Sequence, residues 1–185
     1  MENKRKRRSQ GGFTLGEVLV AILILLMMST IVAAGIPLAK RAYDKVTIGA
    51  NAQVLMSTAV NVLRDELGTA QNVSVDMDAD IVTYYNPNNH SYSKLSKNTV
   101  NGSIMLNQNM GVSLTATGEL PLISPERATN DMYVQYMDVS EVRNSNNQVE
   151  KVIFENIKVV RPLGAAETST MAELPSLTIR IISAS

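Results

Sequence analysis

The chain has 185 residues, of which 45% are hydrophobic, and this length suits one domain of ordinary size plus an anchor. Its net charge of zero conceals an asymmetry, because residues 1–12 carry a net charge of +4 and the other 173 residues carry −4. A negative net charge makes the larger part poorly suited to nonspecific binding of nucleic acid. The absence of cysteine excludes disulfides, a lipid-modified cysteine and cysteine-based metal sites.

A basic block at residues 4–8 precedes a long apolar run. The uncharged run from Val18 to Ala39 has 22 residues. As a helix it would be about 33 Å long, enough to cross the hydrocarbon core of a bilayer. We therefore expect a membrane-spanning helix that includes Val18 and Ile36. The basic block predicts that the amino terminus stays in the cytoplasm and that the carboxyl terminus lies outside.

Two simpler interpretations of this segment are an ordinary secretory signal peptide and a plain signal anchor. Ala33-Ala34-Gly35 resembles a signal-peptidase site, but the apolar run is longer than the roughly 7–15 residues typical of signal peptides. A plain anchor does not explain Gly12-Phe13, nor Glu17 at the head of the run. A carboxylate deep in a bilayer costs about 2.5–3.5 kcal/mol and usually has a functional partner.

The segment after the basic block reads Gly12-Phe13-Thr14-Leu15-Gly16-Glu17-Val18-Leu19-Val20-Ala21-Ile22. It resembles the class III signal of type IV prepilins and pseudopilins. The resemblance implies that a membrane-embedded prepilin peptidase cuts between Gly12 and Phe13 and then methylates the new amino group of Phe13. It also implies that Glu17 is the family's glutamate in the apolar helix. Gly16 departs from the family, which usually has a larger aliphatic residue there.

Cleavage before Phe13 would create a free amine at the edge of the bilayer. Within one chain this amine lies four residues from Glu17, which is one helical turn. Two opposite charges near lipid are each costly alone, and pairing offsets much of that cost. We therefore hypothesise that Glu17 serves assembly by meeting the amine of a neighbouring subunit, which would fix the axial register.

Helical spacing continues beyond the membrane segment. Apolar residues recur three and four positions apart at Ala52, Met56, Ala59, Val60, Leu63 and Leu67. Gly68 is a stop signal, so we expect one helix from Phe13 to Leu67. Pro37 lies inside this helix and should kink it or melt it locally, and Gly49 is a second weak point.

After Gly68 the sequence alternates short β-type runs with turn signals. The expected strands are Ile81–Tyr85, Ser103–Asn107, Val112–Thr117, Tyr133–Val142, Val149–Val160 and a last strand that places Leu177, Ile179 and Ile181 on one face. Asn144–Asn147 predicts the clearest hairpin turn, and a second turn is expected near Asn109–Gly111. The longest irregular stretches, expected to be surface loops, are Tyr85–Thr99, Gly118–Asn130 and Leu163–Pro175.

These elements predict an α+β fold in which a long amino-terminal helix packs on an antiparallel β-sheet, and the pilin fold implied by the resemblance agrees. The expected parts are a removable leader (1–12), a transmembrane and fibre-core helix (13–39), an amphipathic continuation (40–68) and a β-rich domain (69–185). Pilin domains often close a carboxyl-terminal loop with a disulfide. A cysteine-free chain must hold its last segment in another way.

The acidic triplet Asp76, Asp78 and Asp80 is a weak calcium candidate, because hard cations favour clustered carboxylates. The helix–loop–helix calcium template would need Gly at position 81 and Glu at position 87, where the chain has Ile81 and Pro87. A solvated turn is therefore the preferred interpretation, and we expect no cofactor. His90 is the only histidine and lies in a polar loop, which argues against a zinc site or a catalytic triad.

The sequence thus favours a structural subunit, not an enzyme, of a type IV pilus or related pseudopilus in the cytoplasmic membrane and then in a surface filament. Its expected partners are other pilin subunits, the prepilin peptidase and methyltransferase, the lipid bilayer and the membrane platform of a pilus or type II-like secretion system. Long irregular stretches favour a minor over a major subunit. The alternative is a single-pass anchored extracellular domain that binds a ligand or catalyses a reaction without polymerising.

Overall fold

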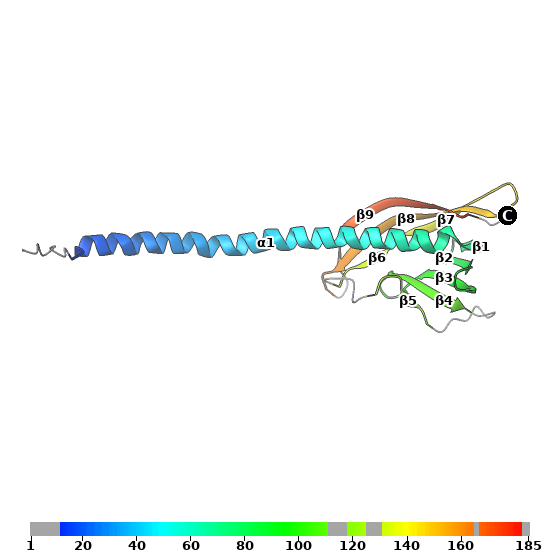
Figure 1. Ribbon diagram of the computed structural model, residues 1–185, viewed down its shortest axis with the longest axis horizontal. Helices are drawn as coiled ribbons and strands as arrows, with labels where there is room; N and C mark the ends of the chain where they lie inside the picture. The colour runs from blue at the N-terminus through cyan, green and yellow to red at the C-terminus, as the bar shows by residue number, and fades with distance from the viewer. Residues whose placement is uncertain (1–11, 111–117, 125–130, 165–166, 183–185) are drawn as a thin grey trace, which may run out of the picture. The chain divides into compact units, whose positions relative to one another are not determined.

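The computed structural model of the protein describes residues 12–110, 118–124, 131–164 and 167–182. Within these residues one helix, α1 (Leu15–Gly68), precedes nine β-strands (Figure 1). The chain divides into two compact units at Lys45–Val46. We call α1 up to Lys45 the stem and the chain from Val46 onward the head. The predicted α+β fold, a long amino-terminal helix and antiparallel strands, is confirmed.

The helix begins two residues later than expected and ends at Gly68, the predicted stop. A kink or local melting was expected at Pro37, and the melting is wrong, because the helix runs through this residue without a break. Proline removes a single N–H from the helical ladder, and the hydrogen bonds on either side propagate cooperatively.

The stem has no core of its own. Every residue from Leu15 to Lys45 is exposed, including large apolar side chains such as Leu25 and Ile31. By length and composition, α1 is the one helix among the described residues that could cross a membrane. An apolar surface on all sides of a helix is typical of a membrane-spanning segment, so the stem suggests membrane anchoring.

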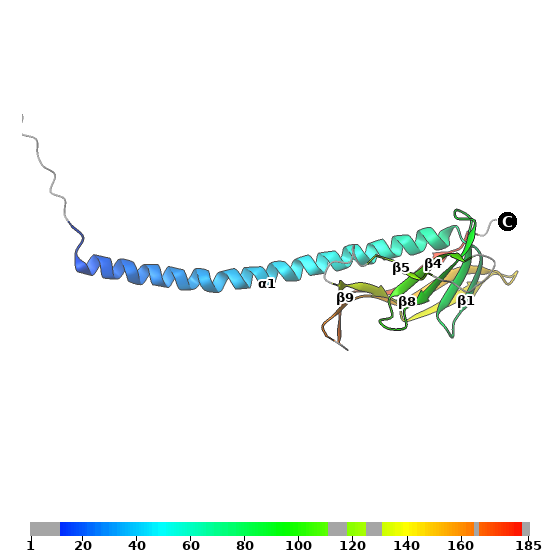
Figure 2. The same ribbon diagram turned by 90° about the horizontal axis from the view of Figure 1, so that it is seen from below.

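The head buries one stripe of α1 against its sheets, and Figures 1 and 2 show this part of the helix lying over them. The buried residues of the stripe are Ala52, Leu55, Ala59, Leu63 and Leu67. Met56 and Val60, which the sequence placed on this stripe, are only partly buried and pack at its margin. Each fully buried leucine contributes about 1.5–3 kcal/mol, so the helix is held mainly by this stripe.

A single carboxylate also ties the end of α1 to the first sheet. Glu66 Oε2 accepts hydrogen bonds from Tyr84 Oη at 2.9 Å and Asn86 Nδ2 at 3.0 Å. Its Oε1 accepts one from Gln108 Nε2 at 3.0 Å. Burial, with the nearby Glu66 charge, raises the pKa of Tyr84 well above the ordinary tyrosine value.

The strands form two antiparallel sheets, not the single sheet expected. The first has the order β1-β2-β3-β4-β5. Its strands are β1 (Gln71–Asp76), β2 (Ile81–Asn86), β3 (Ser91–Lys97), β4 (Ile104–Met110) and β5 (Leu120–Pro121). All five strands lie in sequence order, which makes this sheet a meander, so its contacts are mostly local.

The second sheet is organised around the long strand β8. Its strands are β6 (Tyr133–Gln135), β7 (Asp138–Arg143), β8 (Val149–Pro162) and β9 (Thr168–Arg180). Both β6 and β7 pair with successive parts of one edge of β8, and β9 pairs with the other edge. The hairpin predicted at Asn144–Asn147 is confirmed between β7 and β8.

The single strand expected at Tyr133–Val142 is wrong, because Tyr136 and Met137 separate β6 from β7. At the same level β8 departs from regular geometry, since Asn156 has a φ of 50°. Asparagine tolerates this left-handed conformation better than most residues. The regular backbone pairing is therefore interrupted at neighbouring positions, between β6 and β7 and at Asn156 of β8.

All three stretches expected to be loops contain strand residues. The stretch Tyr85–Thr99 holds β3, Gly118–Asn130 holds the two-residue strand β5, and Leu163–Pro175 holds the first half of β9. The strand β1 was not predicted, because its sequence is mostly polar. The turn expected near Asn109–Gly111 is wrong for Asn109 and Met110, which belong to β4. The strand expected at Val112–Thr117 lies outside the described residues.

The carboxyl-terminal segment is held by pairing and burial in place of a disulfide. The strand β9 pairs with β8 from Thr168↔Pro162 to Arg180↔Lys151. Leu177, Ile179 and Ile181 are all buried, as predicted. Beyond the strand, Ile182 N donates to Gly68 O at 3.4 Å, which brings the chain back to the end of α1.

Candidate functional site

The start of α1 is a reciprocal capping arrangement between Thr14 and Glu17. Glu17 N donates to Thr14 Oγ1 at 3.3 Å, and Thr14 N donates to Glu17 Oε2 at 2.9 Å. Thr14 Oγ1 also donates to the same carboxylate oxygen at 3.0 Å. Threonine before the first helical residue and glutamate three positions later form a capping box, which satisfies N–H groups that the helix leaves unpaired.

The capping box gives Glu17 a local role that the sequence reasoning missed. The signal was present in the sequence, since Thr-x-x-Glu directly before an apolar run is the pattern of a capping box. Within a single chain the carboxylate therefore already has partners at the helix end.

The two residues at the expected cleavage point lie outside the helix. Gly12 and Phe13 precede the cap, and Phe13 is 87% exposed. A Cβ added at Gly12 or at Gly16 would meet no atom within 4 Å. The fold itself therefore does not require glycine at either position, and a requirement for Gly12 has to come from outside the chain.

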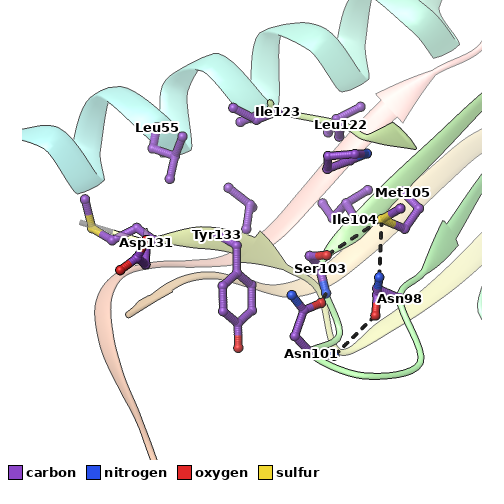
Figure 3. Close-up of a pocket in the computed structure, with 13 residues that line it drawn as sticks. Leu55, Asn98, Asn101, Ser103, Ile104, Met105, Leu122, Ile123, Asp131 and Tyr133 are labelled. Carbon is purple, nitrogen blue, oxygen red and sulfur yellow. Dashed lines mark hydrogen bonds between the residues drawn. The ribbon is translucent and has the colours of Figure 1, made fainter. Parts of the chain in front are cut away.

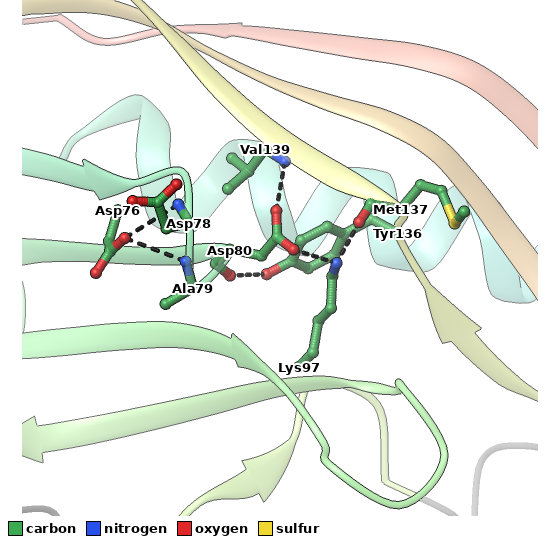
Figure 4. A network of polar contacts seen from close by, with 8 residues as sticks. All are labelled: Asp76, Asp78, Ala79, Asp80, Lys97, Tyr136, Met137 and Val139. Atoms are coloured by element: carbon green, nitrogen blue, oxygen red, sulfur yellow. Dashed lines mark hydrogen bonds and ion pairs between the residues drawn. The ribbon is translucent and has the colours of Figure 1, made fainter.

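The side chains of Asp76 and Asp80, two of the three aspartates of the weak calcium candidate, bind different partners (Figure 4). Asp76 Oδ1 accepts from the backbone N–H groups of Asp78 and Ala79, both at 3.1 Å, and so closes the turn between β1 and β2. Asp80 Oδ2 lies 2.5 Å from Lys97 Nζ. Among the described residues, no three His, Cys, Asp or Glu side chains are grouped to hold a metal ion.

Asp80 instead joins the two sheets (Figure 4). Its Oδ1 accepts from Val139 N at 3.1 Å, and its backbone oxygen accepts from Tyr136 Oη at 2.6 Å. Lys97 Nζ also donates to Met137 O. The aspartate and lysine come from the first sheet and the other three residues from the β6–β7 region, so this network stabilises the relative placement of the sheets.

The head contains a cavity of about 320 Å³ that the sequence did not predict (Figure 3). Its walls include Leu55 of α1, Ile104 of β4 and Leu122, and Asn98 and Asn101 lie at the turn between β3 and β4. The described lining residues include Ser103, Asp131 and Tyr133 but no histidine, lysine or cysteine. His90 is exposed on the turn between β2 and β3.

A family model of the prokaryotic N-terminal methylation motif matches residues 7–33. No curated protein and no solved structure is significantly similar to the chain. The matched residues include Gly12, Phe13, the capping box and most of the apolar stem. The amino-terminal segment is therefore a methylation motif of the type IV prepilin type, and it indicates that the chain is a type IV pilin-like precursor.

Proposed function

We propose that the protein is a structural subunit of a type IV pilus or a related pseudopilus. The observation that carries this proposal is the methylation motif at residues 7–33 directly ahead of a stem whose residues are all exposed. A helix without a core of its own must bury its surface in lipid or against other chains. A subunit that moves from a membrane into a fibre does both in turn.

In this proposal the prepilin peptidase cuts between Gly12 and Phe13 on the cytoplasmic side and the new amine of Phe13 is methylated. The chain then crosses the membrane once, with its amino terminus inside and the head outside. The exposed position of Phe13 ahead of the helix supports access by the peptidase. A membrane platform powered elsewhere would extract the subunit into the fibre.

Glu17 has two successive sets of partners in this proposal. In the monomer the Thr14 groups hydrogen-bond its carboxylate, which lowers the cost of a charge near lipid. In the fibre the amine of a neighbouring subunit would meet the same carboxylate. Thr14, Gly16, Glu17, Val20, Ala21 and Ile24 line a shallow hollow on the helix. Gly16 leaves room beside Glu17 for this approach.

All three stretches that favoured a minor subunit contain strand residues, in β3, β5 and β9, so they no longer favour a minor over a major subunit. A pilus and a pseudopilus are both filaments of such subunits. A head-to-tail contact that does not close on itself generates a filament in either case.

The direct test is the intact mass and amino-terminal sequence of the protein isolated from membranes and from sheared surface filaments. The expected chain starts at methylated Phe13 and is present in both fractions. A chain that keeps its leader, or one that starts near Ile36 after cleavage at Ala33–Gly35, would favour the non-polymerising anchored domain and contradict the proposal.

Glu17→Gln separates the two roles of this residue. Glutamine still accepts hydrogen bonds in a capping box, so the helix end should form while the charge is lost. We expect this variant to insert and to be cleaved like the wild type but to enter filaments poorly. Glu17→Leu, which removes both roles, is the matched control. Incorporation of Glu17→Gln at the wild-type level would refute the assembly role of the charge, whatever the result for Glu17→Leu.

A further inference from the structure

The cavity in the head has a mostly apolar wall and reaches solvent. Leu55, Ile104 and Met132 of this wall are buried, whereas Asn101 and Asp131 line the cavity and are exposed. Its volume of about 320 Å³ falls in the range of small-molecule sites. An apolar cavity of about 150 Å³ holds one benzene molecule, so this one has room for about a dozen heavy atoms.

One side of the cavity carries two hydrogen-bond donors that share a poor acceptor (Figure 3). Asn98 Nδ2 donates to Met105 Sδ at 3.8 Å, and Ser103 Oγ donates to the same sulfur at 3.7 Å. We call these two groups the donor pair. A thioether sulfur is a weak acceptor, and Ser103 is only 8% exposed. Buried donors normally have stronger partners, so the donor pair is available to a better acceptor.

The turn between β3 and β4 holds the donor pair in place. Asn98 N donates to Ser103 O at 2.8 Å, and Gly102 N donates to Asn98 O at 2.9 Å. Asn98 Oδ1 accepts from Val100 N at 2.8 Å, which fixes the side-chain amide. Gly102 has a φ of 73°, in the left-handed region that favours glycine. Donors that are fixed in advance reduce the entropy lost when a ligand binds.

Met105 is the part of this site that is best suited to move. Its side chain is unbranched and flexible, whereas the donor pair is held by the turn. An oxygen atom in the place of the Met105 sulfur would give both donors a stronger acceptor. The described lining residues include the carboxylate of Asp131 but no lysine, arginine or histidine. Since an unpaired charge is costly to bury, the ligand should be uncharged.

We propose that this cavity binds an uncharged, mainly apolar small molecule whose carbonyl oxygen accepts hydrogen bonds from Asn98 Nδ2 and Ser103 Oγ in place of the Met105 sulfur. The apolar part of the molecule lies against Leu55 and Ile104, which face the same cavity (Figure 3). Such binding belongs to the folded head and goes beyond the proposed function, because it does not depend on whether the chain polymerises.

Methyl heptyl ketone is a suitable probe, because it has one carbonyl group and about ten heavy atoms, which fit the cavity. The full chain, isotope-labelled at its methionine methyl groups, is placed in lipid nanodiscs without detergent and titrated by methyl NMR. We expect the ketone to shift the signals of Met105 and Met132, which line the cavity. The signals of Met77 and Met137, which do not line it and are 59% and 58% exposed, should stay unchanged.

Two matched probes separate the carbonyl oxygen from the rest of the ligand. The olefin with a methylene group in place of that oxygen has the same shape but accepts no hydrogen bond. Nonanoate has a similar chain and is ionised at about pH 8. We expect the ketone to bind about tenfold more tightly than the olefin, as two net hydrogen bonds would give. It should bind at least about tenfold more tightly than nonanoate.

Substitutions of a donor and of the sulfur should change this preference in opposite directions. Ser103→Ala removes one donor and should reduce the preference for the ketone over the olefin to about threefold. Met105→Leu keeps a similar volume but removes the competing acceptor, so the ketone should bind about threefold more tightly than to the wild type, with Met132 as the reporter. Ser176→Ala, at an exposed position of β9, is the control and should change neither value.

The proposal is overturned if the three probes bind equally well, or if an excess of ketone leaves the Met105 and Met132 signals in place. Shifts of Met77 and Met137 as large as those of Met105 would also overturn it, because the ketone would then coat the head without a specific site. Urea unfolding checks that each variant folds. If Ser103→Ala does not fold, the three probes on the wild type and on Met105→Leu still decide. The subunit is measured in a membrane, so no outcome depends on filaments.

Discussion

The stem and the head bury apolar surface in opposite ways. The stem exposes Leu25 to 67% and Ile31 to 72%, whereas the head buries Phe154, Ile157 and Leu63 completely. Apolar burial is the dominant favourable term in folding, so the head can stabilise itself and the stem cannot. The difference teaches that the stem part of α1 must be covered by something outside the chain, whereas the part in the head is covered by the chain's own sheets. Mutations in the two parts should therefore have different effects.

The largest contrast should come from the only two phenylalanines in the sequence. Phe154 is fully buried and packs edge-on against Tyr136 at 5.2 Å between ring centres. Phe154→Ala should lower the free energy of unfolding of the head by about 3–5 kcal/mol. Phe13→Ala, at the exposed start of the stem, should not change it. Urea titration of the full chain in detergent, followed by circular dichroism, measures the free energy of unfolding of both variants. Equal effects of the two substitutions would contradict the contrast between stem and head.

A charge in the stem should have the reverse effect. Leu25→Arg places a guanidinium near the centre of the apolar run, where it costs about 2.5–3.5 kcal/mol of membrane insertion. Carbonate extraction of membranes should release much more of this variant than of Leu25→Ile. Urea unfolding of the head should be unchanged. Full retention of the arginine variant in the membrane would show that this part of α1 does not lie in lipid.

Alkaline pH should destabilise the head through its buried tyrosines. Burial, with nearby carboxylate charge, raises the pKa of Tyr84 and of Tyr136 above their ordinary value of 10.0. The unfolded chain therefore loses these protons first, and the stability present below pH 10 declines as the pH rises further. Each tyrosine contributes a slope of about 1.4 kcal/mol per pH unit in that range.

The variant Tyr84→Phe should flatten the decline in stability by about that amount, measured as the urea midpoint between pH 9 and pH 11. Tyr43→Phe is the control, because Tyr43 is 71% exposed in the stem. An unchanged slope in Tyr84→Phe would mean that the tyrosine is not protected from ionisation by the fold.

The smallest expected effect lies at the capping box. Thr14→Ala removes the side-chain partner of Glu17 N and should cost about 1 kcal/mol at the helix start, whereas Thr14→Ser should cost much less. Hydrogen exchange of the first amides of α1 in bicelles should be faster in the alanine variant. Equal exchange in both variants would mean that the cap does not hold the helix end.

The sequence predicted features that repeat over many residues. The apolar run, the helix end at Gly68, the Asn-rich hairpin and the alternation of Leu177, Ile179 and Ile181 each depend on local pattern. Glu17 is evident from the sequence as a charge at the head of the apolar run, and the resemblance adds its role in the family, but its capping by Thr14 was not predicted. Features set by distant contacts were not predicted.

The break between β6 and β7 is one of these. It occurs where Tyr136 Oη reaches Asp80 O, 56 positions earlier in the chain. The polar strands β1 and β3 pair through their backbones, and their sequences lack a strong apolar period. The division into two sheets likewise follows from pairings that no local pattern encodes.

The position of β9 constrains the order of events in biogenesis. Among the described residues this strand is the last in sequence, and it completes the second sheet by pairing along most of β8. The head therefore cannot reach its final form until the residues of β9 have been synthesised, long after the stem has been made. If the head lies outside the membrane, as proposed above, its second sheet closes only after β9 has crossed, and a sequence without cysteine needs no thiol oxidation to complete that step.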